Sequence, residues 1–337
     1  MRILAVRQDN SGDVLLTGPA VRALARSGDV YFACGPNGEA AARLLPGVAG
    51  IVRFTAEWIE GEPLPVDSAA LAATVAELEA LAIDEAVIFT SFHQSPLPTA
   101  LVLRLAGVAR IHAISVDYPG SLLDTRLRID DDIHEVERSL ALVCAAGFEP
   151  ASDDDRRLRV LPLPSTAHLV QGRFVAVQPG ATVPARRWQP EKMRALVERL
   201  SERRHVVVLG SAAEAALTAF VAGGSGALDL AGKTTFAEFA GLVARADALI
   251  VGNSAGIHVA SATGTPVVTI FPPTIAPVRF APWQTPSVVL GDHAVACAGC
   301  RARVCPQERQ YCTAGVTTDD VLAALAQLGA LRTPVPA

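Results

Sequence analysis

The sequence predicts an α/β protein built from two doubly wound parallel-sheet domains. Short apolar runs alternate with amphipathic helical patterns along the whole chain, as in successive strand–helix–strand units. This alternation stops once, near the middle of the chain, and then begins again. The 337 residues also exceed what one ordinary domain needs. We therefore expect one domain at residues 1–160 and a second at 161–337.

The first half contains four apolar runs that read as strands and four helical patterns. The expected strands are residues 3–6, 30–33, 51–54 and 86–89. The expected helices are one that begins near residue 12 and restarts at Pro19, followed by 69–81, 99–105 and 132–145. Two acidic runs, 130–132 and 153–155, are explained by a helix start and by the linker rather than by a metal site.

The domain boundary is predicted where the alternation of apolar runs and helical patterns is interrupted. A charge run at 152–157 is followed by a proline-rich stretch at 161–165, which is stiff and extended. The alternation then resumes, with expected strands at 174–177, 206–209, 248–251 and 267–271. Expected helices in this half cover 193–200, 235–243 and 255–263.

Composition and charge exclude several classes of protein. Half of the residues are hydrophobic and 19% are charged, so the chain can bury large cores. The net charge of −5 argues against a broad nucleic-acid-binding surface. The apolar run at the N-terminus is too short for a signal peptide or a membrane span. We expect a cytoplasmic protein with reduced cysteines and at most peripheral membrane contact.

The first motif follows the first strand and opens a helix, the place where such sheets bind ligands. Ser11 precedes Gly12, which permits close backbone approach, and Asp13 then projects from the helix N-terminus. A carboxylate there can take a proton from a substrate hydroxyl. The competing interpretation is a helix cap or first-turn acid.

The second motif lies at the strand-to-loop junction that opens the second half. Thr182, Arg186 and Arg187, with the free amides of the loop, could converge on a diphosphate. A solvated basic turn over Trp188 is the alternative.

The third motif contains Gly-Lys-Thr at 232–234, but the P-loop pattern needs a glycine where Ala227 stands. We reject a P-loop and keep Lys233, Thr234 and Glu238 as nucleotide contacts, next to a capping box formed by Thr235 and Glu238.

The fourth motif is a turn between a strand and a helix that allows two interpretations. Its candidate residues are Asn253, Ser254, Ala255, Gly256 and His258. Gly-x-Ser-x-Gly at 252–256 matches the nucleophile elbow of serine hydrolases, with Asp-His at 292–293 downstream. Alternatively, the side chains and amides of this turn bind an anionic or hydroxylated ligand.

The fifth motif is a group of four cysteines within sixteen residues: Cys297, Cys300, Cys305 and Cys312. Their spacing suits a structural zinc or iron ion, since tetrathiolate sites prefer these metals. Four reduced thiols in a loop are the alternative.

Together these segments resemble glycosyltransferase family 9, the ADP-heptose:lipopolysaccharide heptosyltransferases. The matching segments are 1–4, 11–14, 134–138, 178–181, 186–188, 229–234, 253–258 and the cysteine tail. The resemblance implies a GT-B fold, in which two Rossmann-like domains face each other across a cleft and the last helix can return to the first domain. It also implies inverting, metal-independent transfer from a nucleotide sugar.

The resemblance assigns roles to individual residues. Asp13 matches the family's general base, and Ser11, Gly12 and His134 lie on the acceptor side. Arg186 stands where the family commonly has lysine, and Asn253 and Ala255 stand where it has aspartate and glycine. The implied donor is a nucleotide diphosphate sugar such as ADP-heptose, and the acceptor is a glycan, a protein or a small molecule. The two other functions weighed are a serine hydrolase that uses Ser254 and a non-catalytic nucleotide-binding module.

Overall fold

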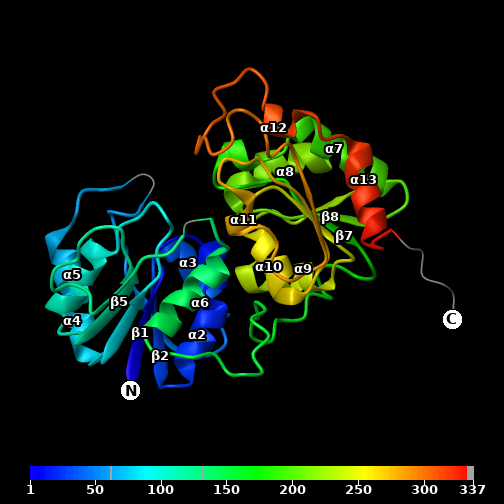
Figure 1. Cartoon of the computed structure of the whole chain (residues 1–337). Coiled ribbons are helices and arrows are strands. Elements are labelled where there is room, and N and C mark those ends of the chain that lie inside the picture. The colour runs from blue at the N-terminus through cyan, green and yellow to red at the C-terminus, as the bar shows by residue number, and fades with distance from the viewer. Residues whose placement is uncertain (61–62, 131, 332–337) are drawn as a thin grey trace. The chain divides into compact units, whose positions relative to one another are not determined.

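The computed structural model describes residues 1–60, 63–130 and 132–331. The chain divides into two compact units, Met1–Leu161 and Pro162–Ala337 (Figure 1). The sequence analysis placed this division between residues 160 and 161. Asp131, in the first acidic run, lies outside the described residues.

The first unit is built on a six-stranded parallel sheet in the order β3-β2-β1-β4-β5-β6. The strands are β1 (Arg2–Val6), β2 (Asp29–Cys34), β3 (Val48–Arg53), β4 (Glu85–Ile88), β5 (Arg110–Ile114) and β6 (Thr125–Leu127). Strand order reverses between β1 and β4, so the loops that follow these two strands part and leave room for a ligand.

Six helices cover the two faces of this sheet. They are α1 (Ser11–Leu16), α2 (Gly18–Ala25), α3 (Pro36–Ala42), α4 (Ser68–Ala80), α5 (Leu97–Leu105) and α6 (Glu135–Ala145). Figure 1 shows α4 and α5 on one face and α2, α3 and α6 on the other. Their apolar sides bury β1 completely from Ile3 to Val6, which explains the uninterrupted apolar run in the sequence.

The second unit repeats this plan with the strand order β12-β11-β10-β7-β8-β9, again all parallel. The strands are β7 (Val175–Gln178), β8 (Val206–Val208), β9 (Leu228–Asp229), β10 (Leu249–Val251), β11 (Val267–Ile270) and β12 (Ser287–Leu290). The reversal lies between β7 and β10, so the loops after these strands form the expected ligand position of this unit.

The helices of the second unit also form two layers. They are η1 (Pro184–Arg186), α7 (Pro190–Ser201), η2 (Ala212–Glu214), α8 (Ala215–Ala222), α9 (Phe236–Arg245), α10 (Gly256–Thr263), α11 (Pro277–Phe280), α12 (Tyr311–Ala314) and α13 (Thr318–Gln327). In Figure 1, α7, α8 and α13 lie on one face of the sheet and α9 and α10 on the other. Trp188 is fully buried in the core that α7 and α13 form with the sheet.

The last described helix belongs to the second unit. The sequence analysis left open a return of this helix to the first domain. Instead, Val321, Ala324 and Leu325 of α13 are buried in the core that β7, α7 and β11 also form.

Sequence reading missed several short elements. Helix α3 begins at Pro36 directly after Gly35, a pair that is equally typical of a turn, and proline is common at the first helical position. The edge strands β6 and β12 carry half-buried side chains, and β9 has only two residues. Their patterns are therefore weaker than those of the central strands.

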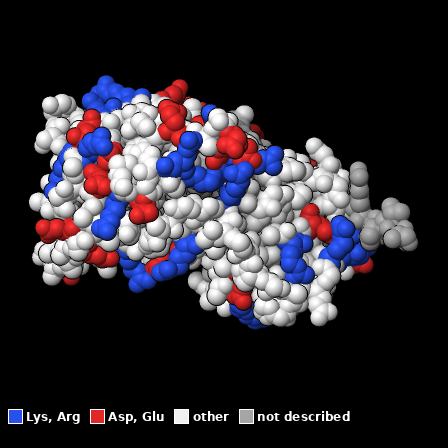
Figure 2. Space-filling view, turned by 90° about the horizontal axis from the view of Figure 1, so that it is seen from below, with Lys and Arg blue, Asp and Glu red and all other residues white. Residues whose placement is uncertain are grey.

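Two surface properties complete the description. No helix in the described ranges is long and apolar enough to cross a membrane. On the face shown in Figure 2, acidic and basic side chains are interspersed, in line with the small negative net charge.

Candidate functional site

The site of the first unit lies where β1 ends and α1 begins. Asp13 is the third residue of α1, and its side chain is 21% exposed. Asn10 precedes the helix and provides no side-chain cap, so the first turn of α1 is not fixed by the usual capping bond. Asp13 is held by another residue, Arg7.

Arg7 is a buried guanidinium directly after β1, with a side-chain exposure of 2%. It donates hydrogen bonds through Nη2 to Asp13 Oδ1 at 3.0 Å and to Ser91 Oγ at 2.9 Å. Nη1 donates to Glu135 Oε2 at 3.3 Å, and Nε forms an ion pair with Asp9 Oδ2 at 2.7 Å. Four segments of the unit therefore meet at one side chain.

Charge pairing explains how this guanidinium is accommodated. Burial alone favours the neutral form of Arg7, but Asp9, Asp13 and Glu135 together more than offset it and raise the pKa of Arg7. Glu135 is itself 1% exposed, so it depends on Arg7 for its charge partner in the described structure. Removal of one partner would leave the others as uncompensated buried charges.

The three acceptor-side candidates have local structural roles. Ser11 donates its hydroxyl to the carbonyl of Asn37 at 2.7 Å, which connects α1 to α3. Gly12 is buried within α1. His134 is buried and caps α6, because its Nδ1 accepts the backbone N–H of Val136 at 3.2 Å. His134 thereby holds the helix that carries Glu135.

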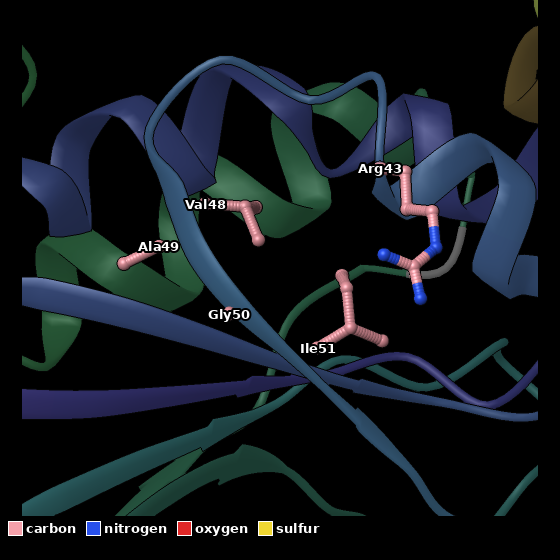
Figure 3. A pocket seen from close by; sticks show the side chains of 5 residues that line it. All are labelled: Arg43, Val48, Ala49, Gly50 and Ile51. Atoms are coloured by element: carbon pink, nitrogen blue, oxygen red, sulfur yellow. The ribbon is translucent and has the colours of Figure 1, made fainter.

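A cavity of about 280 Å³ adjoins this site. It lies beyond the carboxyl ends of β4 and β5 and is lined by Phe92, Gln94, Ile114, Ser115, Val116, Arg128, Ile129 and Arg138. Gln94 connects it to the site, since its Nε2 donates to Asp9 Oδ1 at 2.5 Å. A second hollow of about 210 Å³ runs along the edge strand β3, where Arg43 and Ile51 point into it (Figure 3), and it contains none of the candidate residues.

The site of the second unit is formed by the loops after β7 and β10. Arg187 donates to the carbonyl of Ala181 through Nε at 2.9 Å and Nη2 at 2.7 Å, so it holds the loop that carries Thr182. The backbone N–H of Asn253 donates to the carbonyl of Arg186 at 3.1 Å. The two loops are therefore joined at Arg186, whose side chain is half-buried.

Glycines allow these loops to pack closely. A Cβ at Gly252 would lie 2.6 Å from the Arg186 carbonyl oxygen, and a Cβ at Gly256 would lie 2.2 Å from Gln178 Oε1. Neither distance is compatible with a side chain unless its neighbours move. Gly252 is thus required by close packing against backbone at the end of β10, whereas the atom that obstructs a side chain at Gly256 is the end of the flexible Gln178 side chain.

The candidate residues of the turn lie at or near the start of α10. Asn253 is buried, Ser254 and Ala255 are half-buried, and α10 begins at Gly256. His258 is buried one turn further on, with its ring 6.4 Å from that of Phe280. The N-terminus of α10 therefore lies at the carboxyl edge of the sheet, where its partial positive charge favours an anion.

The serine-hydrolase interpretation finds no support in this geometry. Ser254 donates its hydroxyl to Gln178 Oε1 at 3.2 Å, which leaves it without a histidine base in the described residues. His293 Nε2 instead lies 3.1 Å from the Phe271 carbonyl. A triad needs the nucleophile, base and acid in sequential contact, and these contacts do not provide it.

The side chains of the third motif make mainly local structural contacts. Lys233 Nζ donates to the carbonyl of Asp229 at 2.8 Å, and the predicted capping box of Thr235 and Glu238 is confirmed at the start of α9. The N–H and hydroxyl of Thr235 donate to the Glu238 carboxylate and lower its pKa. Thr234 precedes this cap and is half-buried.

The four cysteines of the tail are not gathered into a metal-binding group. All are free thiols, and no cluster of three or more His, Cys, Asp or Glu in the described ranges could hold a metal ion. They are nevertheless neighbours: burial, together with the nearby Cys297, Cys305 and Cys300, raises the pKa of Cys312 to about 11. The segment that carries Cys297, Cys300 and Cys305 has no helix or strand before α12.

This cysteine segment is bonded to the loop after β11 and to the loop after β7. Gly299 and Arg301 donate their N–H groups to the carbonyls of Pro273 and Thr274 at 2.7 and 3.0 Å. Ala185 is held on both sides, since its N–H donates to the Arg303 carbonyl at 2.9 Å and its carbonyl accepts from Gln310 Nε2 at 2.7 Å.

Two parallel sheets, each flanked by helices on both faces, match the GT-B-like fold of known glycosyltransferase structures. A profile of glycosyltransferase family 9 (heptosyltransferase) matches residues 94–310, and the chain belongs to this family. A search of curated protein sequences gave no match.

Solved structures share this fold over nearly the whole chain. A glycosyl transferase of family 9 from Veillonella parvula has a TM-score of 0.77 at 14% identity and covers 97% of this chain and 96% of its own. The ADP-heptose lps heptosyltransferase II of E. coli has a TM-score of 0.76 at 20% identity and covers 97% and 98%. The E. coli heptosyltransferase WaaC with ADP-2-deoxy-2-fluoro heptose has a TM-score of 0.74 at 17% identity and covers 97% and 99%.

Sequence reasoning missed the residues that surround Asp13. Arg7, Asp9 and Glu135 carry no assigned role in the sequence analysis. One signal was available: an arginine directly after four fully buried strand residues must find a buried charge partner. Ser91 gave no such signal, because only the fold brings it to Arg7.

Proposed function

We propose that this glycosyltransferase moves a heptose from an ADP-linked donor to an acceptor hydroxyl, with inversion and without a catalytic metal. The observation that carries this proposal is the carboxylate of Asp13 at the start of α1, held by a buried guanidinium at the switch point of the first unit. The names of the similar E. coli structures support the donor, since they include ADP-heptose and an ADP-heptose analogue.

The reaction is a single displacement. Asp13 accepts the proton of the acceptor hydroxyl while the hydroxyl oxygen attacks the anomeric carbon of the sugar. The bond from that carbon to the diphosphate oxygen breaks on the opposite face, which inverts the anomeric configuration. The proton ends on Asp13, and the electron pair of the broken bond ends on the nucleoside diphosphate.

The second unit stabilises the departing diphosphate. Arg186, the Thr182 hydroxyl and the N-terminus of α10 supply positive charge and hydrogen-bond donors where negative charge develops, and the Ser254 hydroxyl joins them when it turns from Gln178 Oε1 to the diphosphate. Arg187 and Lys233 donate hydrogen bonds to backbone carbonyls and so stabilise the conformation of their own loops. Thr234 and Glu238 border the nucleoside, and Asn253, Ala255, Gly256 and His258 line the turn.

Further parts of this proposal concern the acceptor, the compartment and the cysteines. The acceptor is a glycan of the lipopolysaccharide type, as in the named relatives, and a protein or small molecule is the alternative. The enzyme acts in the cytoplasm with at most peripheral membrane contact. Cys297, Cys300, Cys305 and Cys312 hold a structural zinc or iron ion after a rearrangement of their segment. The iron-containing heptosyltransferase TibC, similar over 97% of this chain at 16% identity, supports this last point.

Donor hydrolysis and transfer assays with a panel of nucleotide sugars test the proposal. ADP-heptose should be consumed in preference to UDP- and GDP-sugars, and EDTA should leave the rate unchanged. Asp13→Asn should lower kcat by about 10²–10⁴-fold, the usual contribution of a general base, while ADP affinity stays within a few fold. Full turnover by Asp13→Asn would exclude Asp13 as the base, and an inactive wild type with every donor would overturn the function.

A further inference from the structure

The guanidinium of Arg7 contacts Asp13 and, at the same time, Asp9, Ser91 and Glu135. We propose that Arg7 is the positioning residue of the general base, and that Glu135 and Asp9 share its charge so that Asp13 stays basic enough to react. This inference rests on the proposed function, because it assigns Asp13 as the base.

Geometry gives the positioning role. Arg7 has four contacts from four segments: Asp9 after β1, Asp13 on α1, Ser91 after β4 and Glu135 on α6. With its guanidinium held from so many directions, Arg7 cannot rotate without breaking a buried contact. Asp13 Oδ1 is bonded to the same Nη2 as Ser91, so the orientation of the carboxylate is fixed by the sheet and not by α1 alone.

Electrostatics gives the second role. A guanidinium that served Asp13 alone would stabilise its charged form strongly and make it a poor proton acceptor. Here three carboxylates contact one guanidinium. Glu135 is almost completely buried, so among them it depends most on the positive charge of Arg7. Gln94 donates to Asp9, and His134 caps the helix that carries Glu135, so both competing carboxylates are themselves held in place.

A purely structural ion-pair cluster would not require this arrangement. Arg22 shows the contrast within the same unit: its Nε and Nη2 donate to Asp154 at 2.8 and 2.7 Å, and both side chains are nearly buried. That pair joins α2 to the segment after α6, and none of its contacts involves Asp13. Arg22 therefore supplies the matched control for the loss of a buried arginine.

The experiment measures transfer against pH for Arg7→Met, Arg7→Lys, Glu135→Gln and the control Arg22→Met, with ADP binding and Tm for each. Arg7→Met removes the cation, so the acidic limb of kcat/KM should move up by about 1–3 pH units. Arg7→Lys keeps the positive charge but loses the planar guanidinium that contacts several partners at once. We therefore expect kcat to fall about 10–100-fold, while the acidic limb of kcat/KM stays near its wild-type pH. Glu135→Gln removes a carboxylate that competes for Arg7, so Arg7 should stabilise the charged form of Asp13 more strongly. The acidic limb of kcat/KM should therefore move to lower pH.

The outcomes separate this inference from the proposed function. If the wild type transfers and Asp13→Asn does not, the function stands. The inference is then overturned if the limb is unmoved in Glu135→Gln, or if Arg7→Lys and Arg22→Met lower kcat equally. Should Arg7→Met fail to fold, the isosteric Glu135→Gln and the charge-conserving Arg7→Lys still decide the matter. ADP affinity should remain within a few fold in all variants, because none of them alters the second unit.

Discussion

Replacement of Gly252 by alanine tests whether close packing of two loops keeps Arg186 in place for the donor. The added Cβ would lie 2.6 Å from the Arg186 carbonyl oxygen and 3.5 Å from the Cα of Arg187. Ordinary contact begins at 3.4 Å, so the backbone at Arg186 must move by about 0.8 Å. That movement would weaken the bond from the Asn253 N–H to the same oxygen, which is 3.1 Å long.

The magnitude follows from the nature of the clash. The obstructing atom belongs to the backbone, so no side-chain rotation relieves it, and overpacking of this kind costs about 1–3 kcal/mol. If the loop moves to relieve the clash, the loss appears when the donor binds and Arg186 must return. At 1.4 kcal/mol for each factor of ten, Kd for ADP should rise about 5- to 100-fold.

Calorimetric titration with ADP and thermal unfolding measure the two parts of this cost. Gly315→Ala is the matched control, because Gly315 lies in the same unit at φ −76°, and an added Cβ there meets nothing within 4 Å. Gly315→Ala should leave both values unchanged. If Gly252→Ala binds ADP as tightly as the wild type does, with an unchanged Tm, the loop contact does not control donor binding.

Three further predictions address separate features. Arg186→Ala should weaken ADP binding by about 1.5–3 kcal/mol, the range for a hydrogen bond to a charged group, and calorimetry that finds equal affinity would contradict its placement at the diphosphate. The hydrogen bonds from Arg22 lower the pKa of Asp154 below its ordinary value of 3.8, so this pair stabilises the fold fully above that value and loses the effect progressively as the pH falls through the lowered pKa. Arg22→Met should therefore lower Tm most near neutral pH and by a decreasing amount as the pH falls below 3.8. Without metal, Cys300 should react with iodoacetamide at pH 8 well before Cys312, which is buried and has its pKa raised to about 11; equal rates would contradict that environment. With zinc or iron loaded, elemental analysis should find about one ion per chain and the alkylation of both should slow.

Much of the fold could be predicted from local pattern. The central strands are buried on both faces, so β1, β4, β7 and β10 appear as continuous apolar runs. The capping box at Thr235 could be read directly, because its chemistry depends on residues three positions apart. Helix α3 was missed because its proline start has the same sequence signature as a turn.

The candidate site could be predicted less completely. The position of Asp13 in the first turn of a helix after β1 could be predicted, but the contact of Arg7 with Glu135 spans 128 residues of sequence and exists only once the sheet is assembled. The directions of Arg187 and Lys233 were also beyond prediction, because both turn toward backbone carbonyls of their own loops. Cysteine spacing likewise gave the neighbourhood of the four thiols but not their arrangement.

The two bonds that hold Ala185 have a practical consequence for protein preparation. Arg303 and Gln310, which make these bonds, lie on either side of an exposed irregular stretch that includes Val304, 70% exposed. A protease that cleaves between them would cut no strand or helix and would leave the core of the unit intact. A nicked sample should therefore keep its circular dichroism spectrum while the loop of Arg186 loses part of its support. Purity on a denaturing gel, and not the spectrum, is the appropriate criterion before any failure to bind donor is interpreted.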